Sequence, residues 1–207
     1  MLGGDGIEVP STPPRRILVV EDEDLWWRAV ERALRACNWD CERACSVAEV
    51  ETLLRGGFDF DAVLVDLNLG DGGRGEDVLK LLAARPALIA TVVSSAYGNS
   101  ANTLGLHGVP HVDKSEPFDT LRAALDEEVE LTRMVTSRGL PGAVARSEKG
   151  LLREILDSLR ATGGNQLQAA LRLGMPRTTL RDKMELYGLR SAAFKRPDLT
   201  RHKPPHK

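Results

Sequence analysis

The sequence has no hydrophobic run long enough to cross a membrane. Apolar runs such as Ile17–Val20 and Ala62–Val65 have the length of buried strands and fall far short of the roughly 18 residues that a membrane span needs. The N-terminus contains Asp5 and Glu8 but no apolar core, which excludes a secretory signal there. We therefore expect residues 1–14 to be a disordered leader and the protein to stay in the cytoplasm.

Cysteine and histidine are too sparse for a zinc site. Cys37, Cys41 and Cys45 lie four residues apart, but no histidine lies near them, and the four histidines are scattered along the chain. We interpret the thiols as structural or incidental. Aromatic residues are also few, at 4%, yet 42% of the residues are hydrophobic, which is enough to bury a core in one large domain or two small ones.

The net charge of −2 hides an acidic and a basic part of the chain. Residues 1–145 hold 14 basic and 24 acidic residues, a net charge of −10, whereas residues 146–207 hold 14 and 6, a net charge of +8. A basic module fits a polyanion such as nucleic acid, which would repel the acidic part. From charge alone, an accidental imbalance of solvated groups stays open as the alternative.

From Ile17 onward, short apolar runs alternate with amphipathic stretches. The pattern predicts five strands, at 17–20, 40–44, 62–66, 88–94 and 109–113. It also predicts five helices, at 25–34, 47–55, 76–84, 101–107 and 118–135. Apolar strands separated by helix-length connections form parallel sheets that are covered on both faces. We therefore predict an α/β fold with a doubly wound, five-stranded parallel sheet.

A second, all-helical unit follows a break in this pattern. Gly139 and Pro141 end the preceding helix and mark a linker. Three helices are then predicted, with a tight turn between the last two, at 148–161, 166–173 and 175–187. We place the first domain at 15–135, the linker at 136–147, a small all-α helix-turn-helix domain at 148–190 and a basic disordered tail at 191–207.

Acidic residues follow the first and third predicted strands. Glu21 and Asp22 come directly after the first strand, and Asp66 ends the third. Since the carboxyl ends of parallel strands share one edge of the sheet, these carboxylates should converge, and a hard cation such as Mg²⁺ would relieve their repulsion. The Asp66 carboxylate could then attack a phosphoryl group to form an acyl phosphate, whose oxygens Ser95 and Lys114 would contact.

The order of these residues resembles the receiver domain of bacterial response regulators. The resemblance covers Ile17–Pro117: a strand then Glu21-Asp22, a strand then Asp66-Leu67-Asn68-Leu69, a strand then Ser95-Ala96, and finally Lys114. It implies a flavodoxin-like fold in which a phosphoaccepting aspartate, two further acidic residues and a backbone carbonyl bind Mg²⁺. The implied phosphoacceptor is Asp66, its phosphoryl contacts are Ser95 and Lys114, and the implied metal ligands are Glu21, Asp22, Asp66 and the Asn68 carbonyl.

The chain also departs from the receiver pattern. Glu21 replaces the commoner aspartate, a change that should keep the metal site. Ser115 replaces the usual proline after Lys114, with Pro117 displaced by two residues, so the resemblance does not extend to the cis peptide expected there. His111 stands where receivers carry a switching aromatic residue, and the stretch before Lys114 is about one helical turn short. Phosphorylation is therefore easier to predict than the way in which it is transmitted.

The stretch Gly164–Leu189, GNQLQAALRLGMPRTTLRDKMELYGL, resembles the DNA-binding end of Fis-type regulators. The resemblance implies a helix-turn-helix whose last helix enters the major groove. Its predicted core consists of Ala169, Ala170, Leu173, Leu180, Met184 and Tyr187. Its predicted DNA contacts are Asn165, Arg177, Thr178, Thr179, Arg181 and Lys183. Asp182, Glu185 and Leu186 occupy places that are usually basic or polar, so one module alone should bind weakly.

A leucine stripe in the first helix of this unit offers two interpretations. Leu151, Leu152, Ile155, Leu156 and Leu159 share one face of the predicted helix. The stripe could pair two copies of the chain, and a homodimer would raise DNA affinity through effective concentration. It could equally belong to the module's own core.

Together the patterns predict a transcriptional response regulator. A sensor histidine kinase would phosphorylate Asp66, and this would modulate binding to double-stranded DNA. The chain would not be an enzyme, beyond self-phosphotransfer and self-dephosphorylation, and residues 135–148 hold no phosphate-binding loop for an ATPase. One rival is a phosphorelay adaptor whose helical end binds protein. The other is an aspartyl-phosphate hydrolase, which is weakened because Asp66-Leu67-Asn68 lacks the second aspartate that such enzymes use as general acid.

Overall fold

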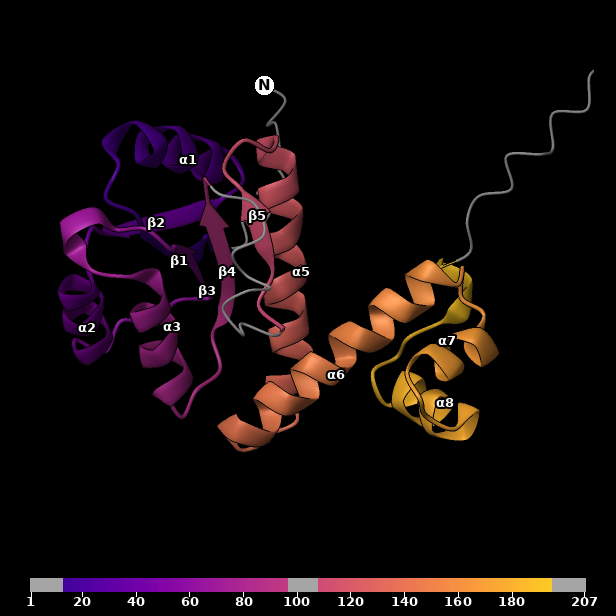
Figure 1. Cartoon of the computed structure of the whole chain (residues 1–207). Coiled ribbons are helices and arrows are strands. Elements are labelled where there is room, and N and C mark those ends of the chain that lie inside the picture. The colour runs from indigo at the N-terminus through magenta and orange to yellow at the C-terminus, as the bar shows by residue number, and fades with distance from the viewer. Residues whose placement is uncertain (1–12, 97–107, 195–207) are drawn as a thin grey trace, which may run out of the picture. The chain divides into compact units, whose positions relative to one another are not determined.

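The computed structural model describes residues 13–96 and 108–194 of the chain (Figure 1). The predicted helix at 101–107 and nearly all of the predicted leader lie outside the described residues. The chain divides into two compact units, residues 1–132 and 133–207, and each unit is described by itself. None of the described helices is long and apolar enough to span a membrane.

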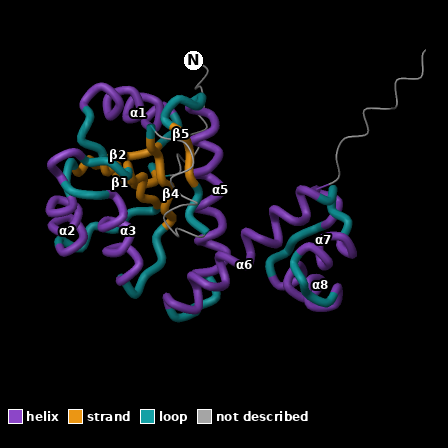
Figure 2. The backbone as a smooth tube through the Cα atoms, viewed as in Figure 1, coloured by secondary structure: helices purple, strands orange, loops and turns teal. Residues whose placement is uncertain are grey.

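The first unit is built around a five-stranded parallel sheet with the strand order β2-β1-β3-β4-β5. Its strands are β1 (Arg15–Val20), β2 (Trp39–Ala44), β3 (Ala62–Asp66), β4 (Ala90–Ser95) and β5 (His111–Asp113). Figure 2 shows these strands in the interior of the unit, with helices around them. The predicted doubly wound parallel sheet is confirmed.

Helices cover both faces of this sheet. The described helices of the unit are α1 (Asp24–Ala36), α2 (Val47–Arg55), α3 (Gly75–Ala84), α5 (Phe118–Thr136) and the short 3-10 helix η1 (Gly70–Gly72). Successive side chains of a strand point to opposite faces. Ile17 and Val19 accordingly pack with α1 and α5, whereas Leu18 and Val20 pack with α2 and α3. The central strand β3 is buried along its whole length because helices cover both of its faces.

The register of the strands brings their carboxyl ends to one edge of the sheet. Val20 of β1 pairs with Val65 of β3, and Asp66 pairs with Ser94 of β4. Residues that directly follow β1, β3, β4 and β5 therefore meet at this edge. Gly75 lets α3 return close to it, because a Cβ atom at this position would lie 2.1 Å from the carbonyl oxygen of Asp66.

The second unit contains three helices and a short terminal turn. They are α6 (Gly142–Ala161), α7 (Gln166–Arg172), α8 (Arg177–Leu186) and the 3-10 helix η2 (Ser191–Phe194). The buried core joins α6, α7 and α8 and comprises Ile155, Leu159, Ala169, Ala170, Leu180 and Met184. Of the other predicted core residues, Tyr187 is also buried, and Leu173 packs against this core while partly buried.

Two features of this unit differ from the sequence-based expectations. Helix α6 begins at Gly142 and not at residue 148, because Pro141 occupies its N-cap position instead of breaking it. Ser191–Phe194 does not belong to a disordered tail: the Gln166 amide donates a hydrogen bond to the Ser191 hydroxyl over 2.8 Å, and Phe194 packs against the core.

The leucine stripe of α6 is interior to the chain. Leu152, Ile155, Leu156 and Leu159 are all buried in the single chain, and Leu151 packs partly buried against the helical core. Ile155 and Leu159 lie in the core of the helical unit and Leu151 packs against it, which favours the second interpretation for these residues, that the stripe belongs to the module's own core.

Candidate functional site

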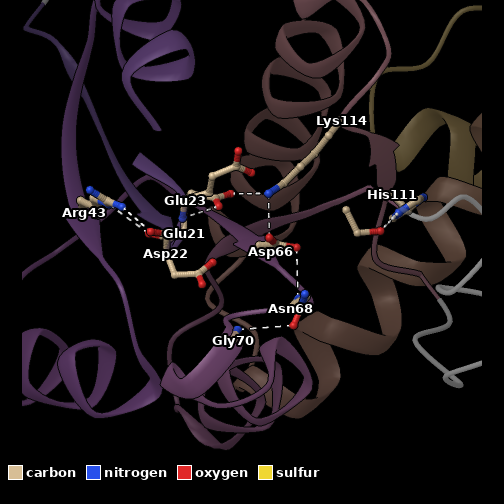
Figure 3. Close-up of polar contacts among 10 residues, drawn as sticks. Glu21, Asp22, Glu23, Arg43, Asp66, Asn68, Gly70, His111 and Lys114 are labelled. Carbon is tan, nitrogen blue, oxygen red and sulfur yellow. Dashed lines mark hydrogen bonds and ion pairs between the residues drawn. The ribbon is translucent and has the colours of Figure 1, made fainter. Parts of the chain in front are cut away.

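Three carboxylates converge at the carboxyl end of the sheet (Figure 3). Glu21 and Asp22 follow β1, Asp66 ends β3, and one oxygen of each lies within 4.8 Å of the others. Glu21 and Asp66 are buried, whereas Asp22 is exposed. The convergence expected from the strand order is therefore present.

Lys114, directly after β5, bridges two of these carboxylates. Its Nζ atom lies 2.7 Å from Glu21 Oε2 and 2.7 Å from Asp66 Oδ2, and the Trp26 ring lies 4.5 Å away on another side. Burial lowers the pKa of Lys114, but the bonds to Asp66 and Glu21 outweigh it and raise this pKa overall. Burial raises the pKa of Glu21 despite the opposing bond from Lys114. The ammonium of Lys114 therefore compensates part of the negative charge of these two carboxylates.

The cluster fits a divalent cation on its exposed side. Among the described residues, no hydrogen bond or ion pair engages the Asp22 carboxylate. A Cβ atom at Gly70 would lie 2.9 Å from Asp22 Oδ2, so the glycine leaves space beside this oxygen. Hard divalent cations bind such oxygen-rich, partly hydrated sites.

The loop after β3 folds around Asp66. The backbone nitrogen of Asn68 donates a hydrogen bond to Asp66 Oδ1 over 3.1 Å, and the Gly70 nitrogen donates to Asn68 Oδ1 over 3.4 Å. Asn68 thus lies beside Asp66, where its carbonyl was expected to serve as a metal ligand. Lys114 and Asn68 together hold the two carboxylate oxygens of Asp66, one each.

Ser95, at the end of β4, forms a hydrogen bond with His111, which stands where receivers carry a switching aromatic residue. Its hydroxyl shares a hydrogen bond of 2.9 Å with Nε2 of His111. Ser115 stands where the receiver pattern has proline, and its nitrogen and hydroxyl both donate to Asp113 Oδ1, over 2.8 and 2.7 Å. The peptide bond between Lys114 and Ser115 is trans. A turn held by hydrogen bonds from Ser115 to Asp113 therefore stands where the receiver pattern has a turn with proline.

Arg43, on β2, belongs to this site and was not predicted. Its guanidinium donates hydrogen bonds to the carbonyl oxygens of Glu21 and Asp22, over 3.0 and 2.9 Å, and to Asp24 Oδ1 over 2.6 Å. No sequence motif reveals this contact, because the pairing of Val19 with Arg43 in the sheet creates it.

The helix-turn-helix places most of its predicted contact residues on the surface. Arg177, Thr178, Thr179 and Arg181 are exposed along the first turns of α8. Asn165 is exposed too, but its side-chain oxygen caps α7 by accepting hydrogen bonds from the nitrogens of residues 167 and 168, over 3.1 and 3.2 Å.

Lys183 does not join this exposed set. Its Nζ atom lies 2.6 Å from Glu148 Oε1 on α6, and the same oxygen accepts a hydrogen bond of 2.7 Å from the Tyr187 hydroxyl. The bond from Lys183 holds the pKa of Glu148 below its usual value, with help from the Tyr187 bond and against the opposing effect of burial. The packing of α8 on α6 therefore turns Lys183 toward the protein.

Comparisons with known proteins find one matching family and related regulatory proteins. Residues 145–187 match the bacterial regulatory protein family Fis. The acid tolerance regulatory protein ActR of Sinorhizobium medicae is 33% identical over 116 residues, and the ActR protein of Rhizobium meliloti is 32% identical over the same length. These regions are 55% of this chain and 59% of each ActR protein, so the chain spans little more than half the length of these relatives.

The chain is similar in fold to solved structures of response regulator domains. A response regulator receiver protein from Sinorhizobium medicae has a TM-score of 0.54 at 18% identity and covers 57% of this chain and 97% of its own. The N-terminal domain of a response regulator/sensory box/GGDEF 3-domain protein from Carboxydothermus hydrogenoformans has a TM-score of 0.50 at 24% identity, over 56% and 95%. At these identities the likeness shows the fold.

The first unit is thus a receiver domain in fold, with the acidic pocket at the carboxyl end of its sheet. The chain combines this fold with C-terminal helices that match the Fis family over residues 145–187, and part of it is similar in sequence to the ActR regulatory proteins.

Proposed function

We propose that this protein is a transcriptional response regulator that accepts a phosphoryl group on Asp66 from a sensor histidine kinase. Phosphorylation then modulates the binding of the C-terminal helices to double-stranded DNA. The observation that carries the proposal is the Glu21, Asp22 and Asp66 cluster with Lys114, in a chain that also has a Fis-family helix-turn-helix.

The chemistry assigned to the pocket is the transfer of a phosphoryl group from a histidine of the kinase to the Asp66 carboxylate. The Asp66 carboxylate attacks phosphorus, a P–O bond forms, and the P–N bond to the kinase histidine breaks. Glu21, Asp22, Asp66 and the Asn68 carbonyl would hold Mg²⁺, which when bound neutralises charge on the phosphoryl oxygens. Lys114 supplies a second, fixed positive charge to these oxygens. The Ser95 hydroxyl contacts them after it leaves His111.

DNA binding is assigned to the exposed face of α8. Arg177 and Arg181 lie four residues apart and therefore on one side of the helix, with Thr178 beside them. Asn165 and Thr179 are in reach of the phosphate backbone in this assignment, and the net charge of +8 on residues 146–207 supports attraction to DNA. A homodimer would strengthen binding through effective concentration.

A phosphorelay adaptor is the second candidate, because α7 exposes apolar side chains. Leu167 is 56% exposed and Leu171 is 73% exposed, one turn apart on the same side of α7. Such a surface suits contact with protein better than contact with phosphates.

A DNA selection on the full-length protein tests the proposed function. Random duplexes are selected with and without a small phosphodonor and Mg²⁺, and Asp66→Asn serves as the matched unphosphorylated control. We expect a preferred sequence whose enrichment changes with phosphodonor in the wild type and stays constant in the variant. If salt-sensitive DNA retention is absent in every condition, the adaptor function takes its place.

A further inference from the structure

We infer that Arg43 is a positioning residue for the metal site, because it holds the loop between β1 and α1 so that Glu21 and Asp22 face Asp66. This inference rests on the proposed Mg²⁺-dependent function. It assigns a role in cation binding to a residue that does not itself touch the cation.

The guanidinium of Arg43 donates one hydrogen bond to each of three acceptors, two in the loop after β1 and one on the first residue of α1. Nε donates to the Glu21 carbonyl, Nη2 to the Asp22 carbonyl, and Nη1 to the Asp24 carboxylate. Three convergent bonds from one planar group fix both position and orientation, which a lysine cannot reproduce. Figure 3 shows Arg43 reaching this loop from the side opposite Lys114.

The backbone of Arg43 is fixed within the sheet. Arg43 pairs with Val19 inside the parallel β1–β2 ladder, and the Glu21 nitrogen continues the ladder by donating to the Ala44 carbonyl over 2.9 Å. The Arg43 side chain is only 20% exposed, and its guanidinium lies 5.7 Å from the centre of the Trp27 ring. The loop is therefore tied to the sheet.

The Asp22 carboxylate depends on this support. In the part of the chain that the structure describes, no donor holds its oxygens, so the side chain is positioned only through the backbone that carries it. Arg43 binds the carbonyl of this residue and leaves its carboxylate open to a cation. Lys114, in contrast, occupies carboxylate oxygens of Glu21 and Asp66 directly.

Positioning and charge predict opposite results when Arg43 is replaced. A nearby positive charge repels Mg²⁺, so its removal would tighten metal binding if charge were its whole effect. Loss of positioning would weaken binding, because the carboxylates would have to be ordered by the cation itself. Residues that orient metal ligands in this way change affinity about 10-fold or more when they are replaced.

The test compares Mg²⁺ affinity in full-length Arg43→Met, Arg43→Lys and wild-type protein by calorimetry. We expect about 10-fold weaker binding in both variants, because neither side chain can hold all three loop acceptors. Arg55→Met is the matched control: Arg55 is exposed on α2 and pairs with Glu51, and the substitution removes the same charge. Its affinity should equal that of the wild type.

A second readout separates positioning from general damage. With a small phosphodonor, the Mg²⁺ concentration that gives half the maximal phosphorylation rate should rise in Arg43→Lys, whereas the rate at saturating Mg²⁺ should stay near that of the wild type. A general loss of structure would lower the saturated rate as well. Thermal unfolding without Mg²⁺ identifies any variant that does not fold. If Arg43→Met does not fold, the Mg²⁺ affinity of the charge-conserving Arg43→Lys decides between positioning and charge.

Equal or tighter Mg²⁺ binding in a folded Arg43 variant would overturn the inference, and so would an equal loss in Arg55→Met. An Arg43→Lys protein that fails to fold would show a structural role and would also count against it. If the wild type neither binds Mg²⁺ nor accepts a phosphoryl group, the proposed function fails instead.

Discussion

The ammonium group of Lys114 lies 2.7 Å from the carboxylate of Asp66. The same ammonium lies 2.7 Å from Glu21, so one buried cation serves two of the three converging carboxylates. A cation that binds here therefore meets a cluster that is already partly neutralised, and it would share the carboxylates of Glu21 and Asp66 with Lys114.

Lys114→Met should destabilise the metal-free protein and increase the stabilisation that Mg²⁺ provides. Removal of one partner from a buried ion pair costs roughly 3–5 kcal/mol in the free energy of unfolding, because the remaining charges are left without compensation. Mg²⁺ can replace the lost charge. Thermal unfolding at several Mg²⁺ concentrations should show a larger rise of the unfolding temperature with Mg²⁺ in the variant than in the wild type. An equal rise in both proteins would mean that Mg²⁺ and Lys114 do not compensate the same carboxylates.

Asp66→Asn should abolish phosphorylation by a small phosphodonor. Intact-mass measurement of the wild type should show one added phosphoryl group that is stable to acid and lost in base, as an acyl phosphate requires. The matched control is Asp71→Asn, which removes an exposed carboxylate of η1. Phosphoryl transfer that persists in Asp66→Asn would place the acceptor elsewhere.

Acid should weaken the contact between α6 and α8 through Glu148. The hydrogen bond from Lys183 is the main cause that holds the pKa of Glu148 below its ordinary value of 4.5 in the folded protein. A lowered pKa means that the stabilisation is complete above 4.5 and is lost as the pH falls through the folded-state pKa. Glu148→Gln should therefore lower stability at neutral pH and flatten its decline in acid.

Thermal unfolding of the full-length protein from neutral pH to about pH 3 measures this effect. Glu154→Gln is the control, since Glu154 lies exposed on the same helix. An unchanged acid slope in Glu148→Gln would mean that the Glu148–Lys183 contact does not contribute.

Arg177→Ala and Arg181→Ala should weaken DNA binding, whereas Lys183→Ala should not remove a DNA contact. A lost base contact costs on the order of 1–3 kcal/mol, and a lost phosphate contact reduces the salt slope by about one. Lys183 is held by Glu148, so its replacement should leave the salt slope nearly unchanged. Gel-shift titrations at several salt concentrations decide this, and a Lys183 effect as large as that of Arg181 would show that Lys183 leaves Glu148 to bind DNA.

The sequence by itself determined the order of the elements and the edge of the sheet at which the acidic residues gather. The reason is local: short continuous apolar runs identify the buried strands, and a hydrophobic period of 3.6 residues identifies the helices. Parallel crossovers then force the carboxyl ends of the strands to one edge. Glu21, Asp22, Asp66 and Lys114 could be grouped in this way because each directly follows or ends a strand.

Only the tertiary structure decided which side chains serve a neighbour that is distant in the chain. Arg43 reaches the acidic loop through the β1–β2 pairing, Lys183 turns to Glu148 through helix packing, and the α6 leucines are buried within the chain. Periodicity shows that a side chain lies on a given face of its element, but not what covers that face. That depends on the contacts between elements, and these form only when the whole domain packs.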